Sequence, residues 1–392
     1  MKKLKDNIFY IGTINPNLRI FDIIMSTEYG TSYNSYLVKG EKIAVVETVH
    51  DRYSEIFFDN IKEITPLEKI DYIIMNHTEP DHSGSIAKLL EINPNITIVG
   101  SAAAIKNITN ITNMEFSSKI VKTGDSLDLG GGMVLDFIIS PNLHWPDSMF
   151  TYVACAKTIF TCDFLGAHYC EPMITDDIIT YPKAYADAFA FYFTAIFGPF
   201  KKFVIDGLNK IKGLDFDMVC TSHGPVLKNG ISTALGLYRK WATVAPIEKN
   251  VAIFYVSAYG YTKSLAKAFA AELEKLGIPT KTYNIIEHPI STLAEKISLA
   301  SGVMFGSPTI NRDAVKPVWD LLSSVDAVGS KGKPCAVFGS YGWSGEACTM
   351  LENRAEGLGF KLVNDCYKVV MKPDENDFNN VRALAITFAK SL

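Results

Sequence analysis

Four side chains that commonly bind metal ions occur within six residues early in the chain. They follow an apolar run, residues 72–75, which is short enough to be a buried strand. The four residues are His77, Glu79, Asp81 and His82. Because Pro80 cannot lie inside a helix and Gly84 relaxes the backbone, we expect them to project from a loop at the end of the strand and to converge. Two histidines and two carboxylates at this density would be costly to bury without a cation, so the segment predicts a metal site.

Three further potential ligands, His144, Asp163 and His223, each follow a short apolar run of strand length. Strand ends on one edge of a sheet share a face, so residues distant in sequence can meet at the first loop. Any one of the three alone would be interpreted as a capped or solvated loop residue, whereas the set completes a site of six or seven ligands. The remaining histidines lack such a pattern and are expected to be surface residues or neighbours of the ligands: His50, His168 and His288.

Length and composition describe a globular protein with more than one core. At 392 residues the chain exceeds a single ordinary core, which predicts two domains. Its hydrophobic content of 48% and charged content of 20% are typical of a soluble globular protein. A net charge of -4 and the lack of a long Lys/Arg run argue against nucleic acid as the main partner. An acidic or metal-dependent small-molecule system fits these values better.

The sequence predicts neither export nor a membrane span. The N-terminus is basic, but the apolar segment 8–14 is short and leads to no small-residue cleavage site. The most apolar stretch, 188–200, falls short of the roughly 20 residues that a span requires and ends in Gly198-Pro199, so we interpret it as a core or subunit-interface helix. The seven cysteines form no C-x-x-C pair and lie mostly in apolar runs, as reduced buried thiols do. We therefore expect a cytoplasmic protein.

Residues 1–248 are expected to form a first domain whose sheet starts near the N-terminus. Short apolar runs separated by Gly, Asn and Lys predict strands at 8–14, 20–25, 33–38 and 42–47. Further strands are expected at 71–75, 96–99 and 119–122, and helices near 51–63, from Ser83 onward and around 101–107. The glycines at 130–132 indicate a turn and are given no chemical role.

Residues 249–392 are expected to form a second domain, because a polar hinge at 246–250 precedes a new apolar strand. Strands are predicted at 251–256, 280–285, 302–306, 334–338 and 362–369. Helices alternate with them at 262–276, 290–298, 314–325, 344–357 and 376–390. Five β-α repeats in about 140 residues predict an α/β domain with a doubly wound parallel sheet.

Three loops at the carboxyl ends of these strands predict a cofactor site, since ligands bind at that edge in this topology. The first loop is rich in hydroxyl groups, opens a helix and suits a phosphate: Ser257, Ala258, Tyr259, Gly260, Tyr261 and Thr262. The others are aromatic or turn-like: Ser307, Pro308, Thr309, Ile310 and Asn311, and Ser340, Tyr341, Gly342, Trp343, Ser344 and Gly345. No Lys follows the glycine of the first loop and no G-x-G-x-x-G occurs, which disfavours ATP and dinucleotides. A flavin mononucleotide (FMN) remains, with Tyr341 and Trp343 as flat surfaces for its ring; the alternative is that these aromatics are core residues.

With both halves considered, the sequence resembles the flavodiiron proteins, also called A-type flavoproteins, over essentially its whole length. The resemblance rests on the motif His77-x-Glu79-x-Asp81-His82, on the three later ligands and on the three loops of the second domain. It implies an N-terminal metallo-β-lactamase-like αββα sandwich and a C-terminal flavodoxin-like doubly wound parallel sheet.

The resemblance also implies a diiron site in which each iron has three ligands of its own and shares one bridging ligand. The ligands of one iron would be His77, Glu79 and His144, those of the other Asp81, His82 and His223, and the bridge Asp163. A mixed set of histidines and carboxylates suits two irons, whereas zinc hydrolases of this fold typically have a His where this chain has Glu79. The added negative charge is expected to favour the ferric state.

The family reduces dioxygen to water, nitric oxide to nitrous oxide, or both, with reduced FMN recharging the irons, and the resemblance implies a head-to-tail homodimer or a dimer of dimers. The sequence has no dinucleotide fingerprint and no C-x-x-C pair and ends after the fifth β-α unit, so the electron donor is expected to be a separate rubredoxin-type protein. The preferred gas stays open, because all the ligand positions are common to both activities. Some members also have a His in the loop where this chain has residues 25–30, so no contribution from such a His is expected. Tyr33, Trp145 and Tyr192 are expected either to shape a gas pocket or to serve packing.

Two rival hypotheses stay open at this stage. The first is a zinc hydrolase of thioesters or nucleic acids with a flavodoxin-like passenger, which the fold alone permits and Glu79 disfavours. The second is a non-enzymatic electron carrier or redox sensor in which the metal domain is structural.

Overall fold

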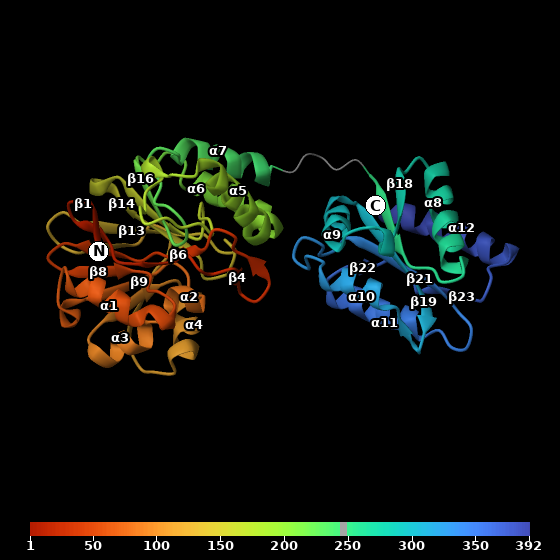
Figure 1. Cartoon of the computed structure of the whole chain (residues 1–392), viewed down its shortest axis with the longest axis horizontal. Helices are drawn as coiled ribbons and strands as arrows, with labels where there is room; N and C mark the ends of the chain where they lie inside the picture. The colour runs from red at the N-terminus through yellow and green to blue at the C-terminus, as the bar shows by residue number, and fades with distance from the viewer. Residues whose placement is uncertain (244–248) are drawn as a thin grey trace. The chain divides into compact units, whose positions relative to one another are not determined.

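The computed structural model describes residues 1–243 and 249–392, and the chain divides into two compact units, Met1–Thr243 and Val244–Leu392 (Figure 1). The polar hinge predicted at 246–250 lies outside the described residues as far as Glu248. The predicted domain boundary after residue 248 therefore stays a prediction. Each unit has its own sheets and its own hydrophobic core.

The first unit contains two main sheets with one shared core between them. The larger sheet has the strand order β1 (Lys2–Lys5), β2 (Ile8–Tyr10), β7 (Tyr36–Lys39), β8 (Ile43–Val46), β9 (Tyr72–Met75), β10 (Thr97–Gly100) and β11 (Ser117–Ile120). The smaller sheet has the order β12 (Ser126–Asp128), β13 (Val134–Ile139), β14 (Met149–Val153), β15 (Thr158–Cys162) and β16 (Met218–Thr221). Two short hairpin-like pairs are β3 (Thr13–Asn15) with β6 (Thr31–Tyr33) and β4 (Ile20–Phe21) with β5 (Met25–Ser26). Buried side chains of both main sheets, among them Ile74 and Phe160, belong to one core cluster.

Helices cover the outer face of each main sheet. Those on the larger sheet are α1 (Ser54–Lys62), α3 (Ile86–Ile92) and α4 (Ala102–Thr112), and those on the smaller sheet are α5 (Pro182–Tyr192), α6 (Lys201–Lys210) and α7 (Ile231–Ala242). Successive side chains of a strand point to opposite faces, so Ile73 and Met75 of β9 pack under the helices while Ile74 packs against the other sheet. These four layers confirm the predicted αββα sandwich.

The strand expected at 33–38 is divided between β6, which ends at Tyr33, and β7, which begins at Tyr36, and the strands before it differ from prediction in two places. The strand expected at 8–14 is split into β2 and β3, because the chain at Gly12 passes so close to the carbonyl oxygen of Tyr33 that a side chain there would clash. The strand expected at 20–25 is instead the hairpin of β4 and β5, whose turn holds Asp22 at a φ of 46°. Both differences depend on local backbone geometry that apolar periodicity does not encode.

The apolar stretch at 188–200 belongs to a longer helix than the sequence predicts. A π-helical turn, Phe193–Phe197, and a 3-10 turn connect α5 to α6, so that Pro182–Lys210 is one helical run of 29 residues. Gly198-Pro199 does not end this run, because Pro199 falls in the first turn after the π-helical segment, where a missing N–H costs little. Among the described residues, this run is the one helix that is long and apolar enough to cross a membrane, and it meets that test by length and composition only. Its buried face, which includes Tyr192, packs in the core of the smaller sheet.

The second unit is one main sheet between two layers of helices. Its strands are β18 (Thr280–Asn284), β17 (Val251–Tyr255), β19 (Gly302–Ile310), β21 (Pro334–Tyr341) and β22 (Lys361–Leu362) in spatial order, with β20 (Asp313–Ala314) beside β19 and β23 (Tyr367–Val370) beside β21. α8 (Tyr261–Lys275) and α12 (Glu375–Ser391) pack on one face, and α9 (Ile290–Leu299), α10 (Lys316–Ser323) and α11 (Glu346–Gly357) on the other. The main strands pair in parallel in the order second, first, third, fourth, fifth, which is the flavodoxin-like order. The predicted doubly wound parallel sheet is confirmed.

Two element predictions in the second unit are wrong in their boundaries. The segment expected as a loop at 307–311 is mostly strand, because β19 continues to Ile310 and pairs there with β20. The strand expected at 362–369 is two strands, β22 and β23, which pair with different parts of β21.

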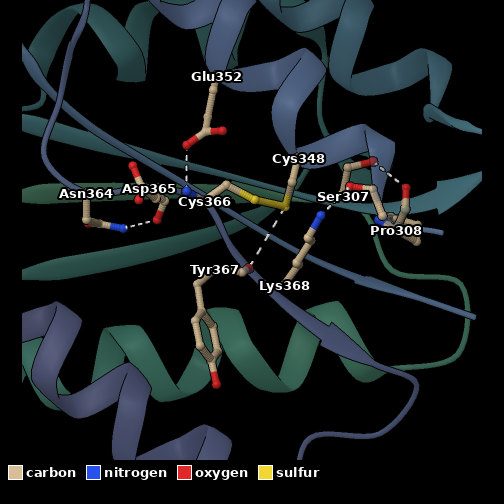
Figure 2. The surroundings of a disulfide bond; sticks show 10 residues. Ser307, Pro308, Cys348, Glu352, Asn364, Asp365, Cys366, Tyr367 and Lys368 are labelled. Carbon is tan, nitrogen blue, oxygen red and sulfur yellow. Dashed lines mark hydrogen bonds between the residues drawn. A yellow bond between two sulfur atoms is a disulfide. The ribbon is translucent and has the colours of Figure 1, made fainter.

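The prediction that the cysteines are reduced is wrong for one pair. Cys348, in the first turn of α11, forms a disulfide with Cys366, which directly precedes β23 (Figure 2). Their Cα atoms lie 5.8 Å apart although the two residues are 18 apart in sequence. No C-x-x-C spacing indicates such a pair, because it forms only when α11 packs against the β22–β23 edge of the sheet. The other cysteines are free thiols: Cys155, Cys162, Cys170, Cys220 and Cys335.

Candidate functional site

The predicted ligands come from the ends of strands in both main sheets of the first unit. β13 and β15 are both antiparallel to β14, and β16 is parallel to β15, so these three strands end at the same edge of the smaller sheet. His144, Asp163 and His223 follow those three strands. β9 belongs to the larger sheet, and hydrogen bonds from Met149 and Thr151 of β14 to Asn76 hold its end against the smaller one. The site is therefore built across the two sheets, not along the edge of one as the sequence suggested.

The first ligand segment is not the open loop that we predicted. Pro80 begins a short helix, α2 (Pro80–Ser83), because proline is tolerated at the first helical position, where its missing N–H has no partner to lose. His77 and Glu79 lie before this helix, and Asp81 and His82 lie within it. The turn thus directs its four ligands in two pairs.

His77 and Glu79, together with His144 and Asp163, form a first ligand group. Nε2 of His77 lies 3.1 Å from Oε2 of Glu79, and Nε2 of His144 lies 3.5 Å from the same oxygen. Nε2 of His144 also lies 3.1 Å from Oδ2 of Asp163. Ligand atoms of these four residues all lie within 4.8 Å of one another, close enough to share one cation.

Asp81 and His82, together with His223, form a second ligand group. Nε2 of His223 lies 3.0 Å from Oδ2 of Asp81, and Nε2 of His82 lies 3.4 Å from Oδ1 of Asp81. Both Nε2 atoms also face Oδ1 of Asp163, at 3.3 Å from His82 and 3.4 Å from His223. The two oxygens of Asp163 therefore face different ligand groups.

These residues fit a pair of metal ions. Both carboxylate oxygens of Asp81 and Oδ1 of Asp163 are buried and accept no hydrogen bond of good geometry from the described residues. Buried charges of this kind are costly unless they are paired or coordinate a metal. Four imidazole nitrogens and three carboxylates that point at two centres supply that ligand set, with Asp163 between the centres.

Carboxylates and a carbonyl oxygen that sequence analysis missed orient three of the histidines. Nδ1 of His77 lies 3.2 Å from Oδ2 of Asp147, and Nδ1 of His82 lies 3.2 Å from Oε2 of Glu47. Nδ1 of His223 lies 2.6 Å from the carbonyl oxygen of Ser32. These contacts turn each Nε2 toward the ligand groups, as the outer partners of metal-binding histidines do. Nothing in the sequence signals these roles, because Glu47 and Asp147 acquire them only by being buried beside the Nδ1 atoms.

Contacts between imidazoles and carboxylates in the cluster shift the pKa values of Asp163 and His77 in opposite directions. Burial raises the pKa of Asp163, but the neighbouring His82 and His144 outweigh this effect and hold the pKa well below its usual range. Burial lowers the pKa of His77, whereas hydrogen bonds to Asp147 and Glu79 outweigh it and raise the pKa to about 10. Both shifts have the same cause: buried imidazoles and carboxylates face one another, and a bound cation would replace the imidazole protons as the partner of the carboxylates.

A cavity of about 230 Å³ adjoins the ligands. Its polar lining includes Asp22, Tyr33, His50, Arg52, Glu79 and Asp81. Asp22, which the sequence analysis did not single out, lies in the β4–β5 turn. This turn comes just before residues 25–30, where some family members have a His and this chain has none. Burial, and then a hydrogen bond with Glu79, raise the pKa of Asp22 to about 6. A small molecule in this cavity would contact a carboxylic acid, a phenol and a guanidinium group.

The three aromatic residues that we associated with a pocket surround the ligands. The ring centroid of Trp145 lies 5.1 Å from that of His77, and those of Tyr33 and Tyr192 lie 5.9 and 6.2 Å from that of His223.

The histidines without a predicted partner pattern have separate places. His168 is buried 5.0 Å from the ring of His223, and burial holds its pKa well below its usual range. His50 lines the cavity, whereas His288 lies in the second unit.

In the second unit, a cavity of about 510 Å³ lies at the carboxyl ends of the strands. The predicted loop residues that line it are Ala258, Tyr259, Tyr261, Pro308, Thr309, Ile310, Asn311, Ser340, Tyr341, Gly342, Trp343 and Ser344, and it also includes Arg312 and Met371. The predicted residues that do not line it are Ser257, Gly260, Thr262, Ser307 and Gly345. Thr262 and Ser340 instead bond to each other through their hydroxyl oxygens at 2.9 Å, which ties the first loop to the third.

The cavity fits a flavin mononucleotide. Trp343 is 98% exposed and Tyr341 is half-buried, so the alternative that these two aromatics are core residues is wrong for Trp343. Tyr259 of the first loop is 86% exposed as well. The hydroxyl oxygen of Ser257 is buried and has no hydrogen-bond partner among the described residues, at the turn where the first N–H groups of α8 are unpaired. A phosphate at this turn would satisfy those donors, and an isoalloxazine ring could stack on the aromatics.

Comparisons with known proteins agree with both halves of the chain. Residues 31–224 match a family described as ODP family beta lactamase, and residues 253–383 match the flavodoxin family. Among solved structures, the rubredoxin oxygen:oxidoreductase of Desulfovibrio gigas has a TM-score of 0.70 and 27% identity, over 100% of this chain and 98% of that one. The flavodiiron protein of Giardia intestinalis has a TM-score of 0.68 and 26% identity, over 100% of this chain and 96% of that one.

Curated relatives match over the same length. The type A flavoprotein fprA of Rhodobacter capsulatus is 34% identical, over 98% of this chain and 90% of its own length. The flavo-diiron protein FprA2 of Clostridium acetobutylicum is 46% identical over 100% of this chain and 99% of its own length. Likeness of this degree over both units shows that the chain belongs to the flavodiiron, or type A flavoprotein, family of oxidoreductases, with FMN and two irons as cofactors.

Proposed function

We propose that this protein reduces dioxygen to water, nitric oxide to nitrous oxide, or both, at a diiron site in residues 1–248, with electrons delivered through FMN bound by residues 249–392. The observation that carries the proposal is the division of the two Asp163 oxygens between two ligand groups. Such a carboxylate can bridge two ions and reduce their mutual repulsion.

The proposed ligands of each iron follow the two ligand groups that the distances define. One iron would be held by His77, Glu79 and His144, the other by Asp81, His82 and His223, and both by Asp163. When bound, two ferrous irons and one reduced FMN supply the four electrons that reduction of dioxygen to water requires. Glu79 adds negative charge where zinc hydrolases of this fold favour a His, which stabilises the oxidised state of the site.

The protein's own residues prepare the cavity beside the ligands for a small substrate. Burial raises the pKa of Tyr33, so its phenol stays protonated and can donate a hydrogen bond into the cavity. The carboxyl group of Asp22, with a pKa raised to about 6, can hold a proton near Glu79 in mildly acidic solution. Trp145 and Tyr192 pack against ligand rings and limit the access of water. A site of this kind suits a diatomic gas whose reduction consumes protons.

FMN would occupy the exposed cavity of the second unit. The predicted contacts are the phosphate turn from Ser257 to Thr262, the segment from Ser307 to Asn311 and the loop from Ser340 to Gly345. The support for them is the cavity itself and the unpartnered hydroxyl of Ser257.

The electron donor would be a rubredoxin-type protein, and the active form a homodimer or a dimer of dimers in the cytoplasm. The sequence has no G-x-G-x-x-G fingerprint for a nicotinamide cofactor. A relative of similar fold is named for its rubredoxin oxygen:oxidoreductase activity. Trp343, exposed beside the cavity, offers a carrier an apolar contact near the flavin.

The test is anaerobic reduction followed by steady-state consumption of each gas. NADH alone, NADH with a rubredoxin reductase, and NADH with reductase and rubredoxin are supplied in parallel, and turnover is expected only in the third mixture. Iron, zinc and FMN content are measured on the same sample. A colourless zinc protein would support the hydrolase hypothesis, and slow, stoichiometric oxidation without turnover would support the electron carrier.

A further inference from the structure

The Cys348–Cys366 disulfide connects two segments that carry walls of the flavin cavity. The loop from Ser340 to Gly345 is called the third cavity loop below. Cys348 lies three residues after its last residue, Gly345. Cys366 lies directly before β23, and Met371, the residue after β23, lines the cavity. Figure 2 shows the bond between the first turn of α11 and the start of β23.

Non-covalent contacts extend this connection to the cavity loop. β23 pairs with β21 through Ser340 and Tyr341, and the N–H of Met371 donates to the carbonyl oxygen of Tyr341 at 2.8 Å. Nζ of Lys368 donates to the carbonyl oxygen of Gly345 at 3.4 Å and lies 5.8 Å from the ring centroid of Tyr341. The third cavity loop is thus held on one side by β23 and on the other by α11, and the disulfide fixes those two supports to each other.

We propose that Cys348 and Cys366 form a reversible thiol–disulfide couple that controls how tightly the cavity holds FMN. The oxidised pair braces the loop that carries Tyr341 and Trp343, and the reduced pair lets α11 and β23 move independently and releases FMN faster. A disulfide limits how far the two segments that it joins can move apart in the folded protein, here the first turn of α11 and the residue before β23. The proposal rests on the proposed position of FMN in this cavity.

The two sulfur atoms have different access to a reductant. Cys348 is 2% exposed and packs in the core under α11, whereas Cys366 is half-buried. An external thiolate can therefore attack Sγ of Cys366. The leaving group is then the thiolate of Cys348 in the first turn of α11, a helix of 12 residues whose unpaired N–H groups and dipole stabilise negative charge there.

The exchange balances with a dithiol as the reductant. The first attack forms a bond between the external sulfur and Cys366 and breaks the bond to Cys348, whose thiolate takes up a proton. The second thiol of the reagent attacks its own sulfur in this mixed disulfide, closes a cyclic disulfide and releases the thiolate of Cys366, which is protonated in turn. One protein disulfide and one dithiol give two protein thiols and one external disulfide, a transfer of two electrons.

The experiment uses the full-length, FMN-loaded protein in buffers of reduced and oxidised dithiothreitol. Iodoacetamide labelling and peptide mass mapping report the state of the two cysteines, and visible absorbance shows that the flavin stays oxidised. FMN release after dilution is followed by flavin fluorescence. We expect labelling of both cysteines together and about tenfold faster release from the reduced protein, which corresponds to about 1.4 kcal/mol.

Variants separate the couple from other effects of the reagent. Cys366→Ser, at the half-buried position, should release FMN fast in both buffers. Cys155→Ser removes an exposed free thiol of the first unit and should keep the difference between the buffers. Equal release from reduced and oxidised wild-type protein, or independent labelling of the two cysteines, would overturn the proposal. Trp343→Ala tests the cavity itself: faster release from this variant together with no effect of dithiothreitol rejects the couple alone, whereas unchanged release rejects the position of FMN.

Discussion

Asp147 offers a test of whether the buried carboxylates orient the ligands. It is fully buried, its two oxygens lie 3.2 and 3.3 Å from Nδ1 of His77, and one of them accepts a hydrogen bond from the hydroxyl of Thr78 at 2.7 Å. In Asp147→Asn the side chain keeps its shape, but the oxygen that faces both Nδ1 of His77 and the hydroxyl of Thr78 becomes a neutral amide oxygen, and the other oxygen facing Nδ1 is replaced by an amide nitrogen, which cannot accept. The variant loses one charge-assisted hydrogen bond and the charge that holds the His77 ring.

The size of the expected effect follows from that loss. A hydrogen bond to a charged group contributes about 1.5–3 kcal/mol, and loss of the outer partner of a metal-binding histidine typically costs about 10- to 100-fold in metal affinity. The second range corresponds to about 1.4–2.8 kcal/mol, so the two values agree. We therefore expect Asp147→Asn to bind ferrous iron about 10- to 100-fold more weakly at one of its two sites.

The assay is an anaerobic titration with ferrous iron against a colorimetric chelator, with circular dichroism to show that the variant is folded. Asp136→Asn is the matched control, because Asp136 lies half-buried on β13 of the same sheet and has no contact with the ligands. A folded Asp147→Asn protein whose two iron affinities equal those of Asp136→Asn would refute the orienting role of this carboxylate.

The remaining predictions concern the two cofactors and the assembly. Asp163→Asn should keep the fold and bind less than two irons per chain, because a neutral amide bridges cations poorly; full iron content with full turnover would contradict the bridge. Glu47→Gln should weaken iron binding in the same range as Asp147→Asn, through His82, in the same chelator competition. Trp343→Ala should weaken FMN binding by about tenfold in a fluorescence titration, because a stacking surface is lost. Light scattering should give the mass of a dimer or tetramer, and a monomer with full turnover would count against the proposed assembly.

The periodicity of apolar residues along the sequence predicted most helices and strands correctly, wherever that periodicity alone decides the structure of the segment. In the second unit, alternating apolar runs and amphipathic helices gave the right order of strands and helices, because a parallel sheet requires a crossover helix between strands. The errors arise where a distant contact decides the backbone. The strand at 8–14 breaks at Gly12 because residue 33 passes beside it, and the strand at 362–369 breaks beside the bond of Cys366 to Cys348. Neither neighbour is visible in a window along the chain.

In the candidate metal site, the ligands were predictable from the sequence and the residues that orient them were not. Ligand types and spacing were sufficient to bring seven residues into one hypothesis, and the described structure brings all of them together. Their supports were not predictable, because Glu47 and Asp147 are ordinary carboxylates in sequence and acquire a role only by facing Nδ1 of His82 and His77. Asp22 was missed for a related reason: the turn that carries it was interpreted as a strand.

The two cofactor sites differ in exposure, and the difference suits their proposed tasks. The proposed iron ligands are buried or nearly so, which keeps water from competing for the metal positions and strengthens the electrostatic interactions there. Trp343 and Tyr259, by contrast, leave large apolar side chains in solvent beside an open cavity, an arrangement that is unfavourable unless a cofactor or a partner covers them. Under the proposed function, electrons from another protein would enter where a cofactor can be approached, and a reaction that consumes a gas and protons would proceed where water is limited. A donor that reaches the flavin edge therefore need not reach the irons. The third cavity loop presents Trp343 and is joined to its supports by the Cys348–Cys366 bond. In this loop, donor access and flavin retention depend on the same residues.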